Sequence, residues 1–321
     1  MNDLPLVSIS CITYNHASYI KECIDGFLMQ KTNFNFEVLI HDDHSIDGTE
    51  EIIKEYAKQH PDIIKPLFEK ENQYSLGKPI GSVVWNLPRA KGKYIAMCEG
   101  DDYWIDPYKL QKQVDFLESH PDYGMCYTKV KRFVQKSNQF IDEWGGPNEK
   151  LEDLLERNTV PTLTAIIRSD IYSSYSKELK KENKNWLMGD YPIWLYFAQN
   201  SKIKFINETT GVYRICNESA SHSKSLIKTY TFRCNFFQIK DQIMKKFKVT
   251  LNEPEYNKIM KAKYFELLPL ALILNDTKCI DSAKKFYSKN PKGFREFMIL
   301  NLSYLTKILL KIKYILKGYK I

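Results

Sequence analysis

The strongest constraint in this chain is an apolar run that ends in a cluster of acidic residues. Residues 94–98 read Tyr-Ile-Ala-Met-Cys, and Glu99, Asp101 and Asp102 follow directly. Carboxylates crowded at the end of a buried strand repel one another, and they are usually tolerated only where a cation or several donors neutralise them. Hard divalent cations prefer carboxylate oxygens and commonly also bind phosphates. The pattern therefore predicts a metal and phosphate site at the carboxyl edge of an α/β sheet.

Short apolar runs alternate with amphipathic stretches through the first hundred residues. Strands are predicted at 7–12, 36–40, 64–68 and 94–98, and helices at 20–28, 52–56 and 80–87. This alternation is typical of a parallel, doubly wound sheet, in which ligands bind outside the carboxyl ends of the strands. Polar clusters follow three of the strands, at 13–15, 42–43 and 99–102. We expect them to converge on one site.

The remainder of the chain continues this pattern and then changes. Strands are predicted at 123–134, 162–167, 202–206 and 211–215, with helices at 107–119 and beyond Pro192. From about Leu226 the periodicity is wholly helical. We therefore expect a catalytic domain at 1–225 and a helical extension at 226–321.

Composition limits the class of protein. With 321 residues and 43% hydrophobic content the chain can bury a sizeable core. The net charge of +8 suits anionic nucleotides, lipid or nucleic acid, but the basic excess lies in the tail after Asp281, and such a tail is more often a solvated or lipid-facing surface than a reader of nucleic acid. We expect no nucleic-acid partner.

Cysteine usage and the lack of long apolar runs indicate the compartment. The seven cysteines are odd in number, irregularly spaced and without a Cys-x-x-Cys pair, which favours buried, reduced thiols in a cytosolic protein over disulfides or a zinc site. No signal peptide and no apolar run of about 20 residues is evident. The expected location is the cytoplasm, where the protein can also lie at the inner face of the membrane.

The first 225 residues or so resemble the family 2 glycosyltransferases, which have the GT-A fold, a Rossmann-like, mostly parallel sheet flanked by helices. The resemblance rests on residues 7–15 (VSISCITYN), 40–49 (IHDDHSIDGT) and 90–96 (AKGKYIA), followed in register by 99–102 (EGDD). Members of the family transfer a sugar from a nucleotide-diphosphate donor, usually with inversion and with a divalent metal. The residues after about 226 lie outside the resemblance.

The resemblance implies roles for the first two polar clusters. Tyr14 is expected to stack on the nucleotide base, with Thr13 and Asn15 beside it, and Asp42 and Asp43 to contact the base and the ribose. Asp42 and Asp43 also suit a turn and a helix cap, and Tyr14 also suits an ordinary core position.

The resemblance also implies a metal site for Mn²⁺ or Mg²⁺. Asp102 is the expected direct ligand, with Asp101 on the metal or the ribose, and these residues match the end of the family's DxD motif. Glu99 stands at the first acidic position and is a departure from that motif, although its longer side chain can still reach the ribose. His222 is expected to complete the metal shell and Arg214 to contact the diphosphate. Alternatively, one of the aspartates caps the next helix and His222 is a surface histidine.

Inverting transfer needs one base that deprotonates the acceptor hydroxyl as it attacks the anomeric carbon. By resemblance this base is Asp190, although many relatives have Glu at the position of Gly189. A cap of a helix that starts near Pro192 is the alternative for Asp190.

The resulting expectation is a metal-dependent inverting glycosyltransferase, either a hexosyl- or an N-acetylhexosaminyl-transferase. Its donor is expected to be a UDP-sugar, and its acceptor a glycan or lipid-linked glycan in surface polysaccharide biosynthesis. A sugar nucleotidyltransferase is disfavoured because no glycine-rich loop follows the first strand. A nucleotide- or glycan-binding module without catalysis remains an alternative. The lysine-rich apolar stretch 294–321 favours equally a peripheral membrane contact and a helix packed on the catalytic domain or in a homodimer.

Overall fold

The computed structural model describes residues 4–78, 85–179, 186–216 and 223–320. The chain forms two compact units. The first, an α/β unit, consists of residues 1–154, 158–184 and 189–215, and the second, a helical unit, consists of residues 155–157, 185–188 and 216–321.

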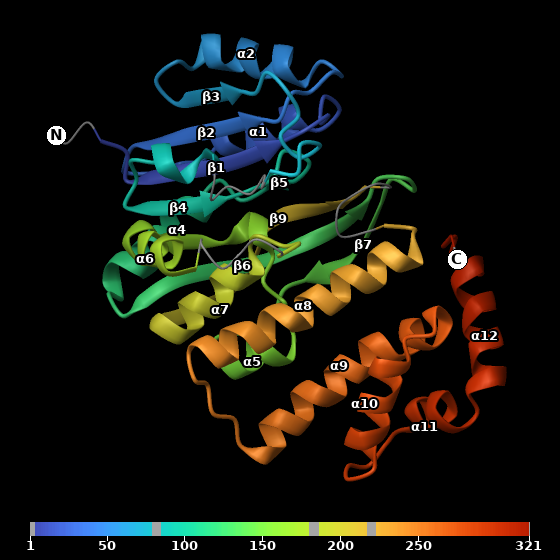
Figure 1. The fold of residues 1–321 in the computed structure, drawn as a ribbon. Helices are drawn as coiled ribbons and strands as arrows, with labels where there is room; N and C mark the ends of the chain where they lie inside the picture. Colours follow the sequence, from blue (N-terminus) through green and yellow to red (C-terminus); the bar gives the residue numbers. More distant parts are fainter. Residues whose placement is uncertain (1–3, 79–84, 180–185, 217–222, 321) are drawn as a thin grey trace. The chain divides into compact units, whose positions relative to one another are not determined.

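The α/β unit is built on a nine-stranded sheet with the order β3-β2-β1-β4-β8-β6-β9-β5, and β7 pairs with β6 (Figure 1). The first four strands are β1 (Val7–Thr13), β2 (Phe36–Asp42), β3 (Ile64–Phe68) and β4 (Tyr94–Met97). They pair in parallel, as the sequence predicts.

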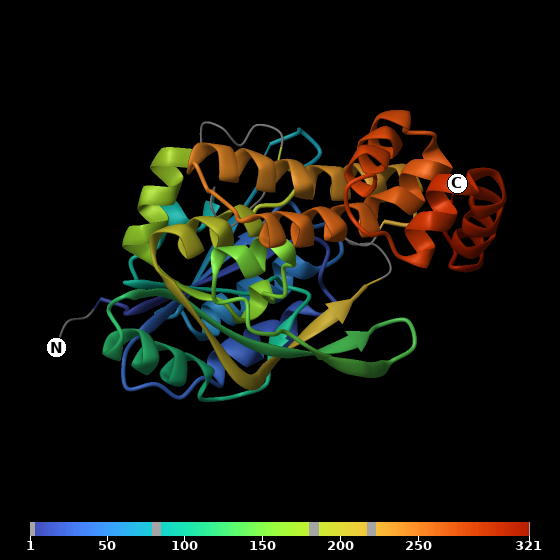
Figure 2. The ribbon, with the colours of Figure 1, turned by 90° about the horizontal axis from the view of Figure 1, so that it is seen from below.

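Beyond β4 the sheet becomes mixed. The strands there are β5 (Tyr103–Trp104), β6 (Tyr123–Val134), β7 (Gln139–Trp144), β8 (Ile166–Arg168) and β9 (Lys202–Ile215). β8 is antiparallel to both β4 and β6, whereas β9 runs parallel to β6. Figure 2 shows the long β6–β7 hairpin projecting from the sheet with the end of β9 alongside it.

Helices cover the sheet of the α/β unit. They are α1 (Ile20–Leu28), α2 (Thr49–Gln59), α4 (Lys109–Ser119), α5 (Leu151–Glu156), α6 (Ser169–Leu179) and α7 (Tyr191–Asn200), with short 3₁₀ turns at Leu87–Arg89 and Thr162–Thr164. The helices predicted at 20–28, 52–56 and 107–119 are confirmed. Most of the helix predicted at 80–87 lies outside the described residues.

Two strand predictions need correction. The strand predicted at 162–167 begins as a 3₁₀ turn, because the Thr164 hydroxyl accepts from the Thr128 amide (3.1 Å) and donates to the Thr128 carbonyl (3.0 Å), in place of a backbone ladder. The strands predicted at 202–206 and 211–215 are one strand, β9, whose pairing with β6 shifts register between them.

A close approach of backbones explains the Ala-Lys-Gly sequence before β4. The amides of Lys91 and Gly92 donate to the Ser8 hydroxyl (3.1 and 2.9 Å), which in turn donates to Glu37 (2.6 Å). A Cβ atom on Gly92 would lie 2.4 Å from the Ser8 nitrogen and 2.7 Å from the Tyr94 carbonyl oxygen. Only glycine fits there, and this contact fixes β4 beside β1.

The helical unit contains α8 (Leu226–Lys246), α9 (Glu253–Leu274), α10 (Thr277–Tyr287), α11 (Phe294–Asn301) and α12 (Ser303–Leu316). Asn252 and Glu255 form a capping box at the start of α9, and Asn275 ends that helix in the left-handed conformation (φ 60°). Tyr264, Leu268 and Phe286 belong to its apolar core. In the described part of the chain, none of the helices is both long and apolar enough to span a membrane.

The first residue of α4 is a buried lysine. Lys109 is fully buried, its Nζ donates to the Gln113 side chain (2.7 Å), and it lies 4.1 Å from the centre of the Trp104 ring. Burial lowers the pKa of Lys109 to about 7, because removal from water disfavours the charged form.

This buried lysine predicts a pH dependence of stability. Between pH 7 and 10.5, the ordinary value for lysine, the unfolded chain holds a proton that the native protein has lost. The free energy of unfolding is therefore expected to rise with pH in this window, by about 1.4 kcal/mol for each pH unit between the two pKa values. Lys109→Met should remove this contribution in urea titrations at pH 7, 8 and 9.

The control for this experiment is Lys112→Met, in which the substituted side chain is 44% exposed. It should keep the rise with pH seen for the unsubstituted protein. A rise that is just as large in Lys109→Met would contradict the assignment to Lys109.

Candidate functional site

The three polar clusters meet at one edge of the sheet, as expected from the sequence. They follow β1, β2 and β4, which are neighbours in the order β2-β1-β4. The amide of Asp43 donates to the Thr13 carbonyl (3.1 Å), and the amide of Gly100 donates to the Ile12 carbonyl (3.0 Å). The end of β1 thus lies between the other two clusters and holds both of them.

Reciprocal hydrogen bonds lock the loops after β1 and β2. The Asn15 amide donates to the Ser45 hydroxyl (2.8 Å), and Asn15 Oδ1 accepts from the Ile46 amide (2.9 Å). The Ser45 amide and hydroxyl both donate to Asp42, whose side chain is fully buried. Asn15 and Asp42 therefore shape the loops, and Tyr14 between them is 44% exposed. The nucleotide contacts of all three residues stay predictions.

A second set of bonds fixes the start of α2. Asp47 accepts from the amides of Ala17 (3.0 Å) and Thr49 (3.1 Å), and the Thr49 hydroxyl accepts from the His16 amide (2.8 Å). Gly48 takes the left-handed conformation (φ 97°), which favours glycine. Asp47 and Gly48 therefore form the turn that leads into α2.

The side chain of Asp43 binds a third segment, the loop after β3. This side chain is 3% exposed, and its two oxygens accept from the amides of Gln73 (2.8 Å) and Tyr74 (3.1 Å). The Asn72 side chain donates to the Asp43 carbonyl (3.0 Å). Asp43 thus holds the loop after β3 at the sheet edge, and its predicted contact with the nucleotide is untested.

The acidic cluster after β4 has unused acceptor capacity. Asp102 is 3% exposed, and its Oδ1 accepts from the Arg214 amide (2.7 Å). Among the described residues no hydrogen bond to its other oxygen or to the Asp101 carboxylate is found, and the Glu99 carboxylate accepts only from its own backbone amide. Burial, followed by repulsion from Asp101 and Glu99, raises the pKa of Asp102 well above its ordinary value. Burial raises the pKa of Glu99 to about 8, with added repulsion from Asp101 and Asp190.

The side chain of Arg214 supports this cluster. Arg214 is 6% exposed, its Nε donates to the Asp101 carbonyl (2.8 Å), and its Nη1 donates to Gln135 (2.6 Å). Its Nη2 pairs with Glu22, and its guanidinium carbon lies 4.8 Å from the centre of the Tyr19 ring. The side chain is thus engaged inside the protein, and the predicted contact with a diphosphate is untested.

Asp190 stands at the N-terminus of α7 and caps it. One of its carboxylate oxygens accepts from the Tyr191 amide (2.7 Å), and the other accepts from the Thr162 hydroxyl (2.6 Å). Its charge acts on Glu99, so it lies within electrostatic reach of the acidic cluster. Sequence reasoning missed Thr162, which lies in a segment predicted to be a strand, and no local signal marks it.

Three cysteines underlie the acidic cluster. The thiols of Cys23 and Cys98 contact the Glu99 carbonyl (3.4 and 3.6 Å), and the sulfurs of Cys11 and Cys23 are 4.0 Å apart. All three are buried, and all seven cysteines of the chain are free, as predicted. The expectation that all seven are buried is wrong for Cys216, Cys234 and Cys279, which are only partly buried.

Two of the three predicted metal ligands, Asp101 and Asp102, belong to the residues that the structure describes. His222 lies outside the described residues. Among the residues that the structure describes, no group of three or more His, Cys, Asp or Glu side chains is placed to hold a metal. A cation that also binds substrate phosphates typically uses one or two protein carboxylates and several waters. The hard oxygens of Asp101 and Asp102 fit such a cation.

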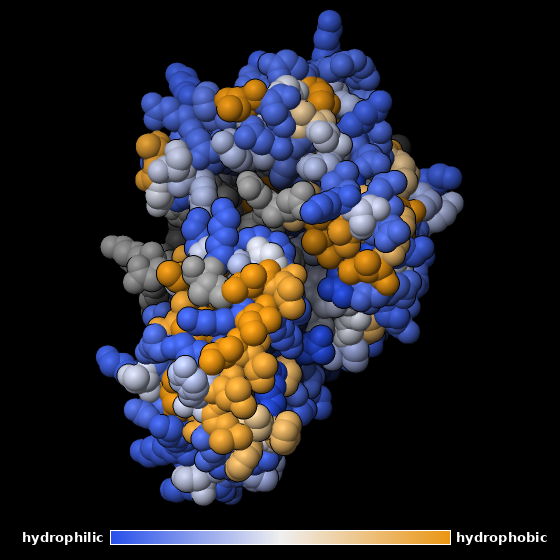
Figure 3. All heavy atoms as spheres, turned by 90° about the vertical axis from the view of Figure 1, so that its right-hand side faces the viewer, coloured by the Kyte–Doolittle hydropathy of each residue, from blue (hydrophilic) through white to orange (hydrophobic). Residues whose placement is uncertain are grey.

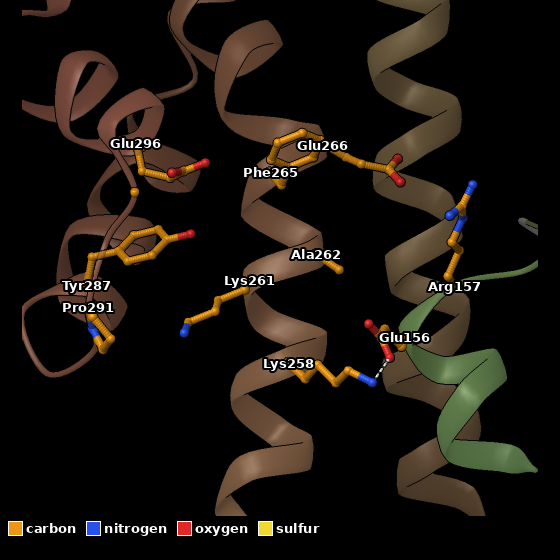
Figure 4. Close-up of a pocket in the computed structure, with 11 residues that line it drawn as sticks. Glu156, Arg157, Lys258, Lys261, Ala262, Phe265, Glu266, Tyr287, Pro291 and Glu296 are labelled. Carbon is orange, nitrogen blue, oxygen red and sulfur yellow. Dashed lines mark ion pairs between the residues drawn. The ribbon is translucent and has the colours of Figure 1, made fainter.

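A pocket in the helical unit has a volume of about 680 Å³ (Figure 4). Glu156 forms an ion pair with Lys258 on its wall, and the ring of Phe265 faces its interior (Figure 4). None of the site residues predicted from the sequence lines it.

Comparisons with known proteins bear on these observations. A family model described as "Glycosyl transferase family 2" matches residues 8–177. An uncharacterized protein of Mycobacterium tuberculosis is 34% identical over 237 residues, which are 72% of this chain and 64% of that protein. The chain therefore spans less than two thirds of this relative's length. A Bacillus subtilis protein named "Putative teichuronic acid biosynthesis glycosyltransferase TuaG" is 26% identical over 68% of this chain and 83% of its own length.

The fold also matches solved structures. The crystal structure of S. aureus TarS 1–349 in complex with UDP-GlcNAc has a TM-score of 0.55 and 18% identity, and the match covers 98% of this chain and 92% of that chain. This likeness confirms the predicted GT-A fold.

The engagement of Arg214 predicts a large loss of stability when it is replaced. Arg214→Met removes the donors to Glu22, Gln135 and the Asp101 carbonyl, and it takes away the positive charge beside the buried Asp102 carboxylate. We expect the free energy of unfolding to fall by about 2–4 kcal/mol in urea titrations.

Arg132→Met is the matched control, because Arg132 pairs with Asp142 on the surface, with side chains 33% and 46% exposed. Its cost is expected to be about 0–1 kcal/mol. Equal losses in the two variants would argue against a supporting role for Arg214.

Proposed function

The chain belongs to glycosyl transferase family 2, and on this premise we propose that it transfers a sugar, with inversion, from a nucleoside-diphosphate donor to a hydroxyl of a glycan acceptor. One observation carries the proposal. Glu99, Asp101 and Asp102 crowd at the carboxyl end of β4 with unused acceptor capacity, and a separate carboxylate, Asp190, lies within electrostatic reach of them. These are the two acidic functions that metal-assisted inverting transfer needs.

We propose a UDP-sugar as the donor. Tyr14 is exposed between two locked loops, so its ring is free to stack on a base. Asp43 lies beside it at the same sheet edge. The TarS structure with UDP-GlcNAc supports this class of donor, either a hexose or an N-acetylhexosamine.

Asp102 and Asp101 would hold a divalent cation, Mn²⁺ or Mg²⁺, together with the donor diphosphate. Bound there, the cation would supply Lewis-acid stabilisation of the charge that develops on the leaving nucleoside diphosphate. Arg214 keeps Asp101 and Asp102 in place from the protein side, through its contacts with the Asp101 carbonyl and the Asp102 carboxylate.

Asp190 would act as the base that takes the proton of the attacking acceptor hydroxyl. The Tyr191 amide and the Thr162 hydroxyl hold one carboxylate oxygen each, so the group has a fixed orientation. Each carboxylate oxygen has a second lone pair with which it can accept the proton. The helix cap and the base are therefore compatible roles.

The proposed setting is the assembly of a surface polysaccharide on the cytoplasmic side of the membrane. The name of the relative TuaG, which refers to teichuronic acid biosynthesis, supports this setting. A sugar nucleotidyltransferase is the weaker candidate, because the loop Thr13–His16 after β1 contains no glycine. A binding module without catalysis would use Asp190 only as the cap of α7.

Donor binding is expected to depend on a divalent cation and on Asp102. UDP at one hundred times its dissociation constant, with Mn²⁺, should stabilise the protein by about 2.7 kcal/mol and raise its unfolding temperature. Asp102→Asn keeps the acceptor for the Arg214 amide but removes the charge. We expect the affinity for UDP with Mn²⁺ to fall at least tenfold, which is about 1.4 kcal/mol.

Thermal shift assays with UDP, GDP, ADP and CDP, each with Mn²⁺ or EDTA, measure this effect. Asp115→Asn on the exposed side of α4 is the control and should bind as the unsubstituted protein does. Shifts that are the same with Mn²⁺ and with EDTA would contradict the metal assignment.

Asp190→Asn is expected to keep donor binding and to lower transfer about 10²- to 10⁴-fold, the usual contribution of a general base. Thr162→Val, which removes one of the two donors to Asp190, should lower turnover less. The measurement is the release of UDP from UDP-sugars in the presence of a panel of glycan acceptors.

Asp170→Asn is a matched control, because Asp170 also accepts from the next amide, that of Ile171 (2.8 Å), at a helix start. It should not change turnover. Full activity of Asp190→Asn would exclude Asp190 as the base and leave donor binding as a separate result.

A further inference from the structure

The last helix, α12, exposes a continuous apolar face. The face is defined by residues whose exposed fractions range from 41% to 82%, namely Tyr304, Leu305, Ile308, Leu309, Ile312, Ile315 and Leu316. Apolar side chains gather in a stripe on this side of the molecule (Figure 3). The residues recur every three or four positions, so they lie on one side of the helix.

The opposite side of α12 packs against the rest of the helical unit. Thr306 is buried, and Leu310 and Tyr314 pack against the apolar clusters of the helical unit. The exposed apolar face is therefore additional to the core of this unit. Exposed apolar patches of this kind mark contacts with other proteins or with membranes.

The charged residues of α12 and of the residues after it are all positive. Five lysines follow Glu296, namely Lys307, Lys311, Lys313, Lys317 and Lys320, and no acidic residue does. At 3.6 residues per turn, Lys307 and Lys311 lie along one border of the face and Lys313 lies along the other, and Lys317 directly follows the last residue of the helix. Lysines in this position can extend their ammonium groups past an apolar surface to phosphate groups.

We infer that the apolar face of α12 binds a membrane surface that contains anionic lipid. A helix with an apolar stripe between lysine borders lies in the plane of such a surface, with the stripe below the headgroups and the ammonium groups among them. Its 14 residues extend about 21 Å, less than the roughly 30 Å of a bilayer core, which fits a helix in the plane of the surface.

A second copy of the chain fits the face less well. Two such faces packed together would bring their lysine borders close to each other, and like charges repel without an acidic partner on either side. Anionic headgroups supply the missing negative charge. The inference stands independently of the proposed function, because α12 contains none of the residues proposed for transfer.

The inference is tested by sedimentation of the full chain with vesicles. One set contains phosphatidylcholine alone, and the other contains phosphatidylcholine with phosphatidylglycerol, whose headgroup is anionic and attracts lysine-rich segments. We expect binding to the anionic vesicles that weakens as salt is raised, and much weaker binding to the neutral ones.

Two variants separate the apolar and the charged contributions. Leu309→Glu/Ile312→Glu places charges on the apolar face and should reduce binding at least tenfold. Lys313→Glu/Lys317→Glu should reduce binding to the anionic vesicles at least fivefold for each lysine, which corresponds to about 1 kcal/mol per lysine. All four positions are exposed, and unchanged unfolding temperatures would show that the variants fold.

Ile141→Glu is the control, because Ile141 is an exposed apolar residue of β7 (52%), outside the helical unit. It should bind as the unsubstituted protein does. Absent vesicle binding, or equal binding by Leu309→Glu/Ile312→Glu, would overturn the inference. A dimer in light-scattering measurements that this double variant abolishes, without vesicle binding by either protein, would assign the face to a second copy instead.

Discussion

The guanidinium of Arg214 is the interaction on which the geometry of the candidate site depends. It joins four segments that are distant in the chain, namely β9, the acidic loop, α1 through Glu22 and the end of β6 through Gln135. Crowded carboxylates need a counter-charge, and Arg214 supplies a fixed one on the protein side of the loop. The opposite side of the carboxylates is then left for a ligand, and a divalent cation with a diphosphate is the chemistry that such oxygens prefer.

The loops at the sheet edge show why a motif can have two roles. Ser45 bonds to both Asn15 and Asp42, and Asp43 holds the loop after β3. These residue types suit the turns by themselves, because short polar side chains accept from nearby amides. The same carboxylates and amides can also form hydrogen bonds with a nucleotide. A substitution of Asp42 that weakens donor binding would therefore reflect loop geometry as well as direct contact, whereas the exposed Tyr14 offers a cleaner separation.

Local sequence pattern predicted the parts of the structure that depend on local physics. The strands β1 to β4 and the convergence of their polar ends follow from apolar periodicity and from parallel pairing. The 3₁₀ turn at 162–164 was not predicted from local pattern, because it depends on hydrogen bonds between the Thr164 hydroxyl and the backbone of Thr128, 36 residues away. Thr162, Gln135 and Glu22 have no local signal, since each acquires its role from a partner brought near by the fold.

The excess positive charge of the chain is concentrated in one segment. The net charge is +8, from 47 basic and 39 acidic residues, and the five lysines after Glu296 contribute +5 of it without any acidic residue. Residues 1–296 therefore carry only +3, and the site at the carboxyl end of β4 is locally acidic. A basic excess that served nucleotide binding would be expected at that site. Its concentration along an exposed apolar helix instead indicates attraction to an extended anionic surface, where many weak contacts act together.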